Sequence, residues 1–256
     1  EEIRRKEDLI QDLFDTPDPG SDPIAMKLTA GDLTQAAKSA VALDKLVDAY
    51  DLTGLAYYYE GLPGSIQREV AGSLVVGNSL LIARGVPMCG EYDIKTLAAM
   101  LMMDRLGIGG SFAEFHPFDF RENFILVGHD GPHHIAIAEG RPVLRSLLKY
   151  HGKPGSGASV EFQIKEGPIT MLGISQKADG QLKFIVGEGQ SLHGPIPPTG
   201  NTNTRGYFGA DVRTFIKDWV MAGPTHHFAL GIGHHAETFA LLGQVLNIET
   251  TVVRPR

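Results

Sequence analysis

The first part of the chain alternates helical hydrophobic patterns with short apolar runs. Apolar residues spaced three and four positions apart predict helices, whereas a short continuous apolar run predicts a buried strand. The helical patterns cover Glu1–Phe14, Thr29–Asp48, Ser65–Ala83 and Asp93–Leu106, and the strand-like run covers Leu52–Tyr59. Helices that alternate with short strands are typical of an α/β layer structure, which we expect up to about residue 111.

Strand-like runs separated by Gly, Pro and Asp turns dominate the chain after Phe112. They lie at Asn123–Val127, Ile135–Ala138, Val143–Tyr150, Ser159–Ile164, Thr170–Ser175 and Leu182–Val186. A loop is predicted at His193–Gly206. Two helices follow at Asp211–Met221 and Ala236–Leu246, and two strands at Phe228–Ile232 and Ile248–Val253. Strands at this spacing are typical of an antiparallel barrel or sandwich.

These patterns predict the fold class α/β plus β. A partial Rossmann-like α/β layer domain occupies 1–111, and a C-terminal antiparallel β-barrel domain with a few helices occupies 112–256. We expect the active site at their junction. The opening helical segment has no initiating Met, so we expect the sequence to be part of a longer chain.

Composition and charge exclude several classes of function. The formal charge is −7, and the 23 basic side chains are scattered, so the sequence carries no electrostatic footprint for nucleic acid. Cys89 is the only cysteine, which excludes an intrachain disulfide and a four-thiolate zinc site and indicates a cytoplasmic protein. No apolar run reaches the roughly 18 residues of a membrane span.

Four side chains are candidates for metal chemistry. Glu91 lies in the string CGEYD, Glu114 in SFAEF, His129 at the end of the apolar run NFILVG, and His227 at a strand edge. Taken singly, a glutamate beside a helix start is commonly a dipole partner, and a strand-end histidine is commonly structural. Together, two carboxylates and two imidazoles suit an octahedral divalent cation such as Mn²⁺ with room for sugar hydroxyls.

An ordered set of strings is similar to the L-arabinose isomerase family of the arabinose/fucose isomerase superfamily. The strings are GEYDIKTLAAML, GGSFAEF, LVGH and GPTHHFAL ahead of NIETTVV. The resemblance implies that Glu91, Glu114, His129 and His227 bind Mn²⁺, or another divalent cation such as Co²⁺ or Mg²⁺, and that His226 is a neighbour of the ligands. It also implies an N-terminal α/β domain that this sequence lacks.

The resemblance further implies an aldose-ketose isomerase acting on a pentose or deoxyhexose. L-Arabinose would give L-ribulose through a cis-enediol intermediate, with Glu91 and Glu114 as the acid/base pair. The expected partners are a small sugar substrate and further copies of the chain, in a hexamer or tetramer, without nucleic acid or membrane.

Three alternatives stay open at this point. One is an L-fucose-type or other sugar isomerase, and another is a non-catalytic sugar-binding homologue. The third is a zinc-type site built from His133, His134, His234 and His235. We rank the zinc site lower because adjacent side chains along a strand point in divergent directions.

Overall fold

The computed structural model describes residues 1–16, 28–59, 62, 64–146, 149–150, 153–154, 157–196 and 202–256. Two compact units divide this part of the chain. Unit 1 contains Glu1–Tyr92 and Asp130–Gln163, with a short segment that ends at Thr202. Unit 2 contains Asp93–His129, Ile164–Ile196 and Asn203–Arg256. The division into 1–111 and 112–256 stays a prediction.

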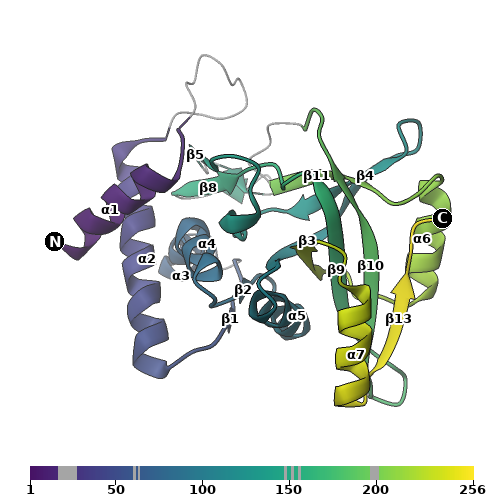
Figure 1. The fold of residues 1–256 in the computed structure, drawn as a ribbon. Helices are drawn as coiled ribbons and strands as arrows, with labels where there is room; N and C mark the ends of the chain where they lie inside the picture. Colours follow the sequence, from purple (N-terminus) through teal and green to yellow (C-terminus); the bar gives the residue numbers. More distant parts are fainter. Residues whose placement is uncertain are drawn as a thin grey trace. The chain divides into compact units, whose positions relative to one another are not determined.

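The helices of unit 1 pack on one another, and at one of their contacts a glycine allows a close approach. Helix α1 (Glu2–Leu13) lies beside α2 (Ala30–Tyr50), which also packs on α4 (Val75–Ala83) (Figure 1). A Cβ atom at Gly77 of α4 would lie 2.8 Å from the Cα atom of Ala40 in α2, so only glycine allows this approach.

Capping residues set two helix boundaries of unit 1. Thr29 and Asp32 form a capping box at the start of α2, where the Thr29 hydroxyl accepts a hydrogen bond from the Asp32 N–H at 3.1 Å. The single helix predicted over Ser65–Ala83 is wrong, since α3 (Ile66–Gly72) ends before α4 begins. At the break, the Ser73 hydroxyl donates to the carbonyl of Val70 at 2.8 Å.

Short strands complete unit 1. A parallel pair, β1 (Leu55–Ala56) with β2 (Met88–Cys89), stands beside these helices and gives the α/β character that the sequence predicts. Two antiparallel pairs are β5 (Val143–Ser146) with β8 (Ala158–Glu161) and β6 (Lys149–Tyr150) with β7 (Lys153–Pro154). The strand predicted at Ile135–Ala138 is wrong: η1 (Ile135–Ile137) is a 3₁₀ turn whose backbone bonds are local.

Unit 2 is built on a closed antiparallel barrel. Around the barrel, the strands follow the order β11, β4, β3, β12, β9 and β10, and β10 pairs again with β11. Their bounds are β3 (Gly109–Asp119), β4 (Phe124–His129), β9 (Gly167–Gln176), β10 (Leu182–Leu192), β11 (Thr202–Tyr207) and β12 (Phe228–Ile232). A further strand, β13 (Glu249–Val253), pairs in parallel with β10. The predicted C-terminal β-barrel is therefore confirmed.

Two sequence expectations for the barrel need correction. The predicted loop His193–Gly206 is wrong at its end, because β11 begins at Thr202. Residues 197–201 of this loop lie outside the described residues. The strand β3 begins at Gly109, whereas the first strand-like run that the sequence predicts in this part is Asn123–Val127. Gly109 and Gly110 adopt positive φ, so the chain turns there and continues directly into the strand.

Three helices accompany the barrel: α5 (Ile94–Arg105), α6 (Val212–Met221) and α7 (Ala236–Leu246). Side-chain carboxylates cap the first two, Asp93 at α5 and Asp211 at α6. Trp219 of α6 packs its buried ring edge-on against Phe115 and Phe228, so it belongs to the core.

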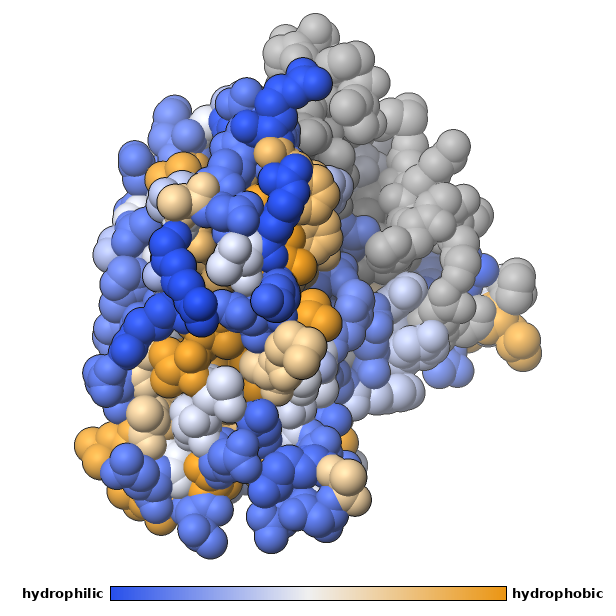
Figure 2. Space-filling model, turned by 90° about the vertical axis from the view of Figure 1, so that its right-hand side faces the viewer, coloured by the Kyte–Doolittle hydropathy of each residue, from blue (hydrophilic) through white to orange (hydrophobic). Residues whose placement is uncertain are grey.

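The surface of unit 2 mixes hydrophilic and apolar side chains. Figure 2 shows several separate apolar groups among hydrophilic atoms on the side where Figure 1 places α6 and α7. Exposed apolar residues of α7 include Leu241 and Val245. Within the described ranges, every helix is too short or too polar to cross a membrane. Homo-oligomerisation stays a prediction.

Candidate metal centre

Glu114 lies in the middle of β3, and the antiparallel register brings histidines to both of its sides. On one side Glu114 pairs with Gly128, the residue before His129. On the other side Phe228 pairs with Ala113, so His227 is level with Glu114. The barrel thereby assembles residues that lie more than one hundred positions apart in the sequence.

Three imidazoles surround the Glu114 carboxylate. The Nε2 atom of His116 lies 3.3 Å and that of His129 3.9 Å from Oε1, while the Nε2 atom of His226 lies 2.5 Å from Oε2. Burial acts to raise the pKa of Glu114, but the His116 hydrogen bond and the charges of His129 and His226 outweigh it and lower the pKa to about 2. Glu114 is therefore an ionised carboxylate at neutral pH.

Asp93 orients the second buried histidine, His227. Its Oδ2 atom lies 3.2 Å from Nδ1 of His227, and its carboxylate also accepts bonds from the N–H and hydroxyl of Thr96 at 3.0 and 2.7 Å. Burial raises the pKa of Asp93, yet these hydrogen bonds lower it to about 2. An ionised carboxylate only accepts, so Nδ1 carries a proton, which leaves Nε2 as the nitrogen that can bind an ion.

Phe112 holds the two buried imidazoles in place. Its ring centroid lies 4.5 Å from that of His129 and 4.3 Å from that of His227, and the two imidazole centroids are 5.1 Å apart. His129 and His227 are 4% and 5% exposed, so both rings are packed rather than mobile. A ligand set fixed in this way needs little rearrangement to bind an ion.

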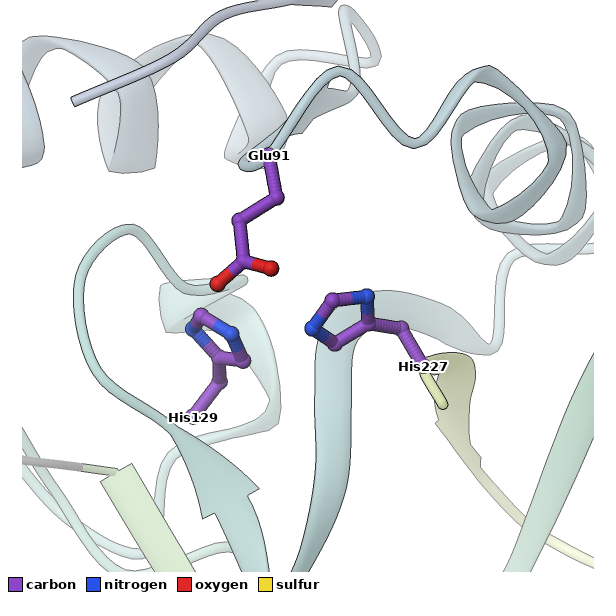
Figure 3. Close-up of side chains that lie close together, drawn as sticks. All are labelled: Glu91, His129 and His227. Atoms are coloured by element: carbon purple, nitrogen blue, oxygen red, sulfur yellow. The ribbon is translucent and has the colours of Figure 1, made fainter. Parts of the chain in front are cut away.

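Glu91 approaches the same two histidines from a turn. Figure 3 shows its carboxylate pointing toward His129 and His227, and the ligand atoms of these three residues lie within 4.8 Å of one another. A second group with the same spacing contains Glu114, His226 and His227. His227 is common to both groups, so Glu91, His129 and Glu114 each share a group with it.

The donor set of this cluster fits a divalent cation. Carboxylate oxygens with imidazole nitrogens suit first-row ions that accept mixed ligands, Mn²⁺ among them. The Asp93–His227 pair adds the carboxylate support that metal-binding histidines usually have.

Sequence reasoning missed two members of this cluster, His116 and Asp93. A signal existed for each of them. His116 follows Glu114 by two positions, which places both side chains on one face of a strand. Asp93 stands at a helix start and was expected only as part of that helix.

The alternative zinc-type set is not gathered in the structure. Within the described ranges, no group of three potential ligands contains His133, His134, His234 or His235. The Nε2 atom of His234 lies 2.9 Å from the carbonyl of Gly189, which indicates a structural hydrogen bond. The ring of His133 packs edge-on against Phe162, with centroids 5.9 Å apart.

Sugar isomerases are among the known proteins similar to this chain. A sulfoquinovose isomerase of Priestia aryabhattai is 26% identical over 164 residues, which cover 63% of the chain and 36% of that protein. L-Arabinose isomerases of Nocardioides sp. (strain ATCC BAA-499 / JS614) and Serratia proteamaculans (strain 568) are 27% and 23% identical over 230 and 232 residues. These matches cover 86% of the chain but 44% and 45% of the relatives. No known family profile matches the chain.

The chain therefore spans less than half the length of these curated relatives. The similarity suggests a family of the arabinose/fucose isomerase type.

Proposed function

We propose that the protein is a metal-dependent aldose-ketose isomerase acting on a pentose or deoxyhexose such as L-arabinose. The observation that carries the proposal is the carboxylate and imidazole cluster around His227. Its members come from a turn, two strands and the start of a third, and the similar proteins are sugar isomerases. A structural role would explain less of this cluster, because a helix cap or an ion pair needs only one carboxylate and one partner.

Glu91, Glu114, His129 and His227 would hold the cation, which we propose to be Mn²⁺. When bound, the cation supplies Lewis-acid stabilisation of the negative charge that develops on the sugar oxygens. His116 and His226 orient the Glu114 carboxylate, and Asp93 keeps His227 in the tautomer that can act as a ligand.

The two glutamates would divide the proton transfers. Isomerisation through a cis-enediol moves one proton between adjacent carbons and another between their oxygens, so it needs a base near C–H and an acid near oxygen. Glu114 is ionised at neutral pH, since its pKa is lowered to about 2. We assign it the base role and assign Glu91 the acid role.

A second substrate class is a sulfonated hexose. The match to sulfoquinovose isomerase favours it, although that match covers 63% of the chain against 86% for the L-arabinose isomerases. L-Fucose-type isomerisation at the same cluster is a third substrate choice. The cluster determines the chemistry, whereas the surroundings of the sugar's far end determine its identity.

The decisive experiment removes and restores the metal. Chelator-treated protein should be inactive, and Mn²⁺ should restore ketose formation from one of L-arabinose, L-fucose and sulfoquinovose. The Glu114→Gln variant is the matched control, because it keeps the shape of the side chain and loses its charge. Absence of metal-dependent turnover on all three sugars would contradict the proposed function.

A further inference from the structure

The turn that carries Glu91 has an unusual backbone. Glu91 and the next residue, Tyr92, both adopt left-handed φ values, 58° and 55°. The other described non-glycine residues with positive φ are Asp51, Asn123 and Asn247, whose short polar side chains tolerate this conformation. A tyrosine does not tolerate it without strain, so the ring at position 92 requires an explanation.

Backbone hydrogen bonds tie this turn to the end of strand β1. The Tyr57 N–H donates to the Cys89 carbonyl at 3.0 Å, and the Tyr92 N–H donates to the Tyr57 carbonyl at 3.2 Å. These bonds lie on either side of Glu91 and set the direction in which its side chain leaves the turn. They need only the backbone of residue 92, so they do not account for its aromatic ring.

The Tyr92 ring stacks on Tyr58 and remains open to solvent. Their centroids lie 5.5 Å apart with an interplanar angle of 20°, and Tyr58 also contacts Tyr59 at 5.4 Å. Tyr92 is 61% exposed and Tyr58 39% exposed. A strained residue thus displays a stacked aromatic surface directly beside a proposed metal ligand. Burial of the ring in a core does not offset the strain, because the ring is exposed.

From this juxtaposition we propose that Tyr58 and Tyr92 form a carbohydrate-binding platform. The outward side of this stacked pair packs against the C–H groups at the end of the sugar farthest from the reacting carbons. Tyrosine suits this role because its ring covers apolar surface while its hydroxyl stays hydrated. The inference rests on the proposed isomerase function and makes the pair a determinant of sugar affinity and chain length, separate from the metal ligands.

The test uses the Tyr92→Asn variant, because asparagine tolerates a left-handed backbone while removing the ring. We expect the KM for the accepted sugar and the Kd for L-arabinitol, an open-chain polyol that cannot isomerise, to rise about 10-fold. Mn²⁺ affinity, followed by electron paramagnetic resonance, should stay within about twofold of the starting protein. The melting temperature should not fall, because strain is relieved.

Matched variants separate stacking from structure. Tyr58→Leu should raise the same KM and Kd. Tyr58→Phe keeps the ring, so both constants should stay at the values of the starting protein. Tyr50→Asn removes another exposed tyrosine of unit 1, which is 71% exposed, and should change neither constant.

The outcomes distinguish the two proposals. Unchanged KM and Kd in both Tyr92→Asn and Tyr58→Leu would overturn the platform while leaving the isomerase function intact. L-Arabinitol binding that depends on Tyr92, in a protein without metal-dependent turnover, would support the platform and overturn the isomerase. If the unaltered protein bound neither L-arabinitol nor the sugars, the platform would also be refuted.

Discussion

The two glutamates of the metal cluster are held in contrasting ways. Glu114 lies inside a barrel strand, half-buried, with three imidazoles around its carboxylate. Glu91 is exposed and leaves a left-handed turn tied down by backbone hydrogen bonds. The contrast shows two ways to position a carboxylate: sheet register and ionic partners for one, backbone strain for the other.

The contrast also suggests a division of labour. A strand in a closed barrel cannot shift without disrupting its neighbours, so Glu114 keeps its distance to the histidines. Glu91 is exposed, and its side chain can change rotamer while the turn stays tied down, so its carboxylate can follow the proton between two oxygens. The following predictions test whether the two residues differ in this way.

The largest effect should come from replacing either glutamate. Glu114→Gln and Glu91→Gln should each lower kcat by about 1000-fold, because each removes one partner of the proposed acid/base pair. Steady-state assays with Mn²⁺ would measure this loss. The two glutamates would be shown to differ if only Glu114→Gln also changed the stability of the protein at low pH. Full activity in either variant would remove that glutamate from the mechanism.

Acid unfolding should depend on Glu114. Its pKa is lowered from 4.5 to about 2 in the folded protein, so the stabilisation is present above pH 4.5 and disappears as the pH falls through about 2. This linkage is worth on the order of 3 kcal/mol. Urea unfolding of the metal-free protein between about pH 5 and pH 2 should therefore show a smaller loss of stability in Glu114→Gln. Equal losses would mean that the histidines do not hold the charge.

Metal affinity should fall strongly in His227→Ala. His227 is the residue shared by both ligand groups, so its loss should weaken Mn²⁺ binding by about 100-fold, the upper end of what changes around a metal site cost. Isothermal titration calorimetry would measure the change. His193→Ala, which removes an exposed histidine outside both groups, is the control. Unchanged affinity in His227→Ala would place the ion elsewhere.

The smallest effect should come from Asp93→Asn. Asparagine caps a helix as well as aspartate, so α5 should remain stable. Because the asparagine side chain is uncharged, it no longer stabilises the proton on Nδ1 of His227. Mn²⁺ affinity should therefore fall by about 10-fold. A drop in melting temperature with unchanged affinity would instead assign Asp93 a purely structural role.

Local sequence patterns predicted several elements because local forces decide them. Helix α7 and strand β12 have the predicted bounds, and the start of α6 follows from its capping residue Asp211. Helix periodicity and capping depend on residues within a few positions of each other. The sequence also supplied Glu91, Glu114, His129 and His227 as candidates, through a resemblance carried by four ordered strings.

The tertiary structure decided what depends on pairing between distant segments. Strand β11 lies in a polar sequence without alternation, and only its pairing with β4 and β10 makes it a strand. The register of β3 with β4 and β12 brings Glu114 beside the histidines, and the folded chain sets Asp93 against His227. Local sequence determined the helices and the types of ligand, whereas closure of the barrel decided which ligands meet, because register is a property of paired strands.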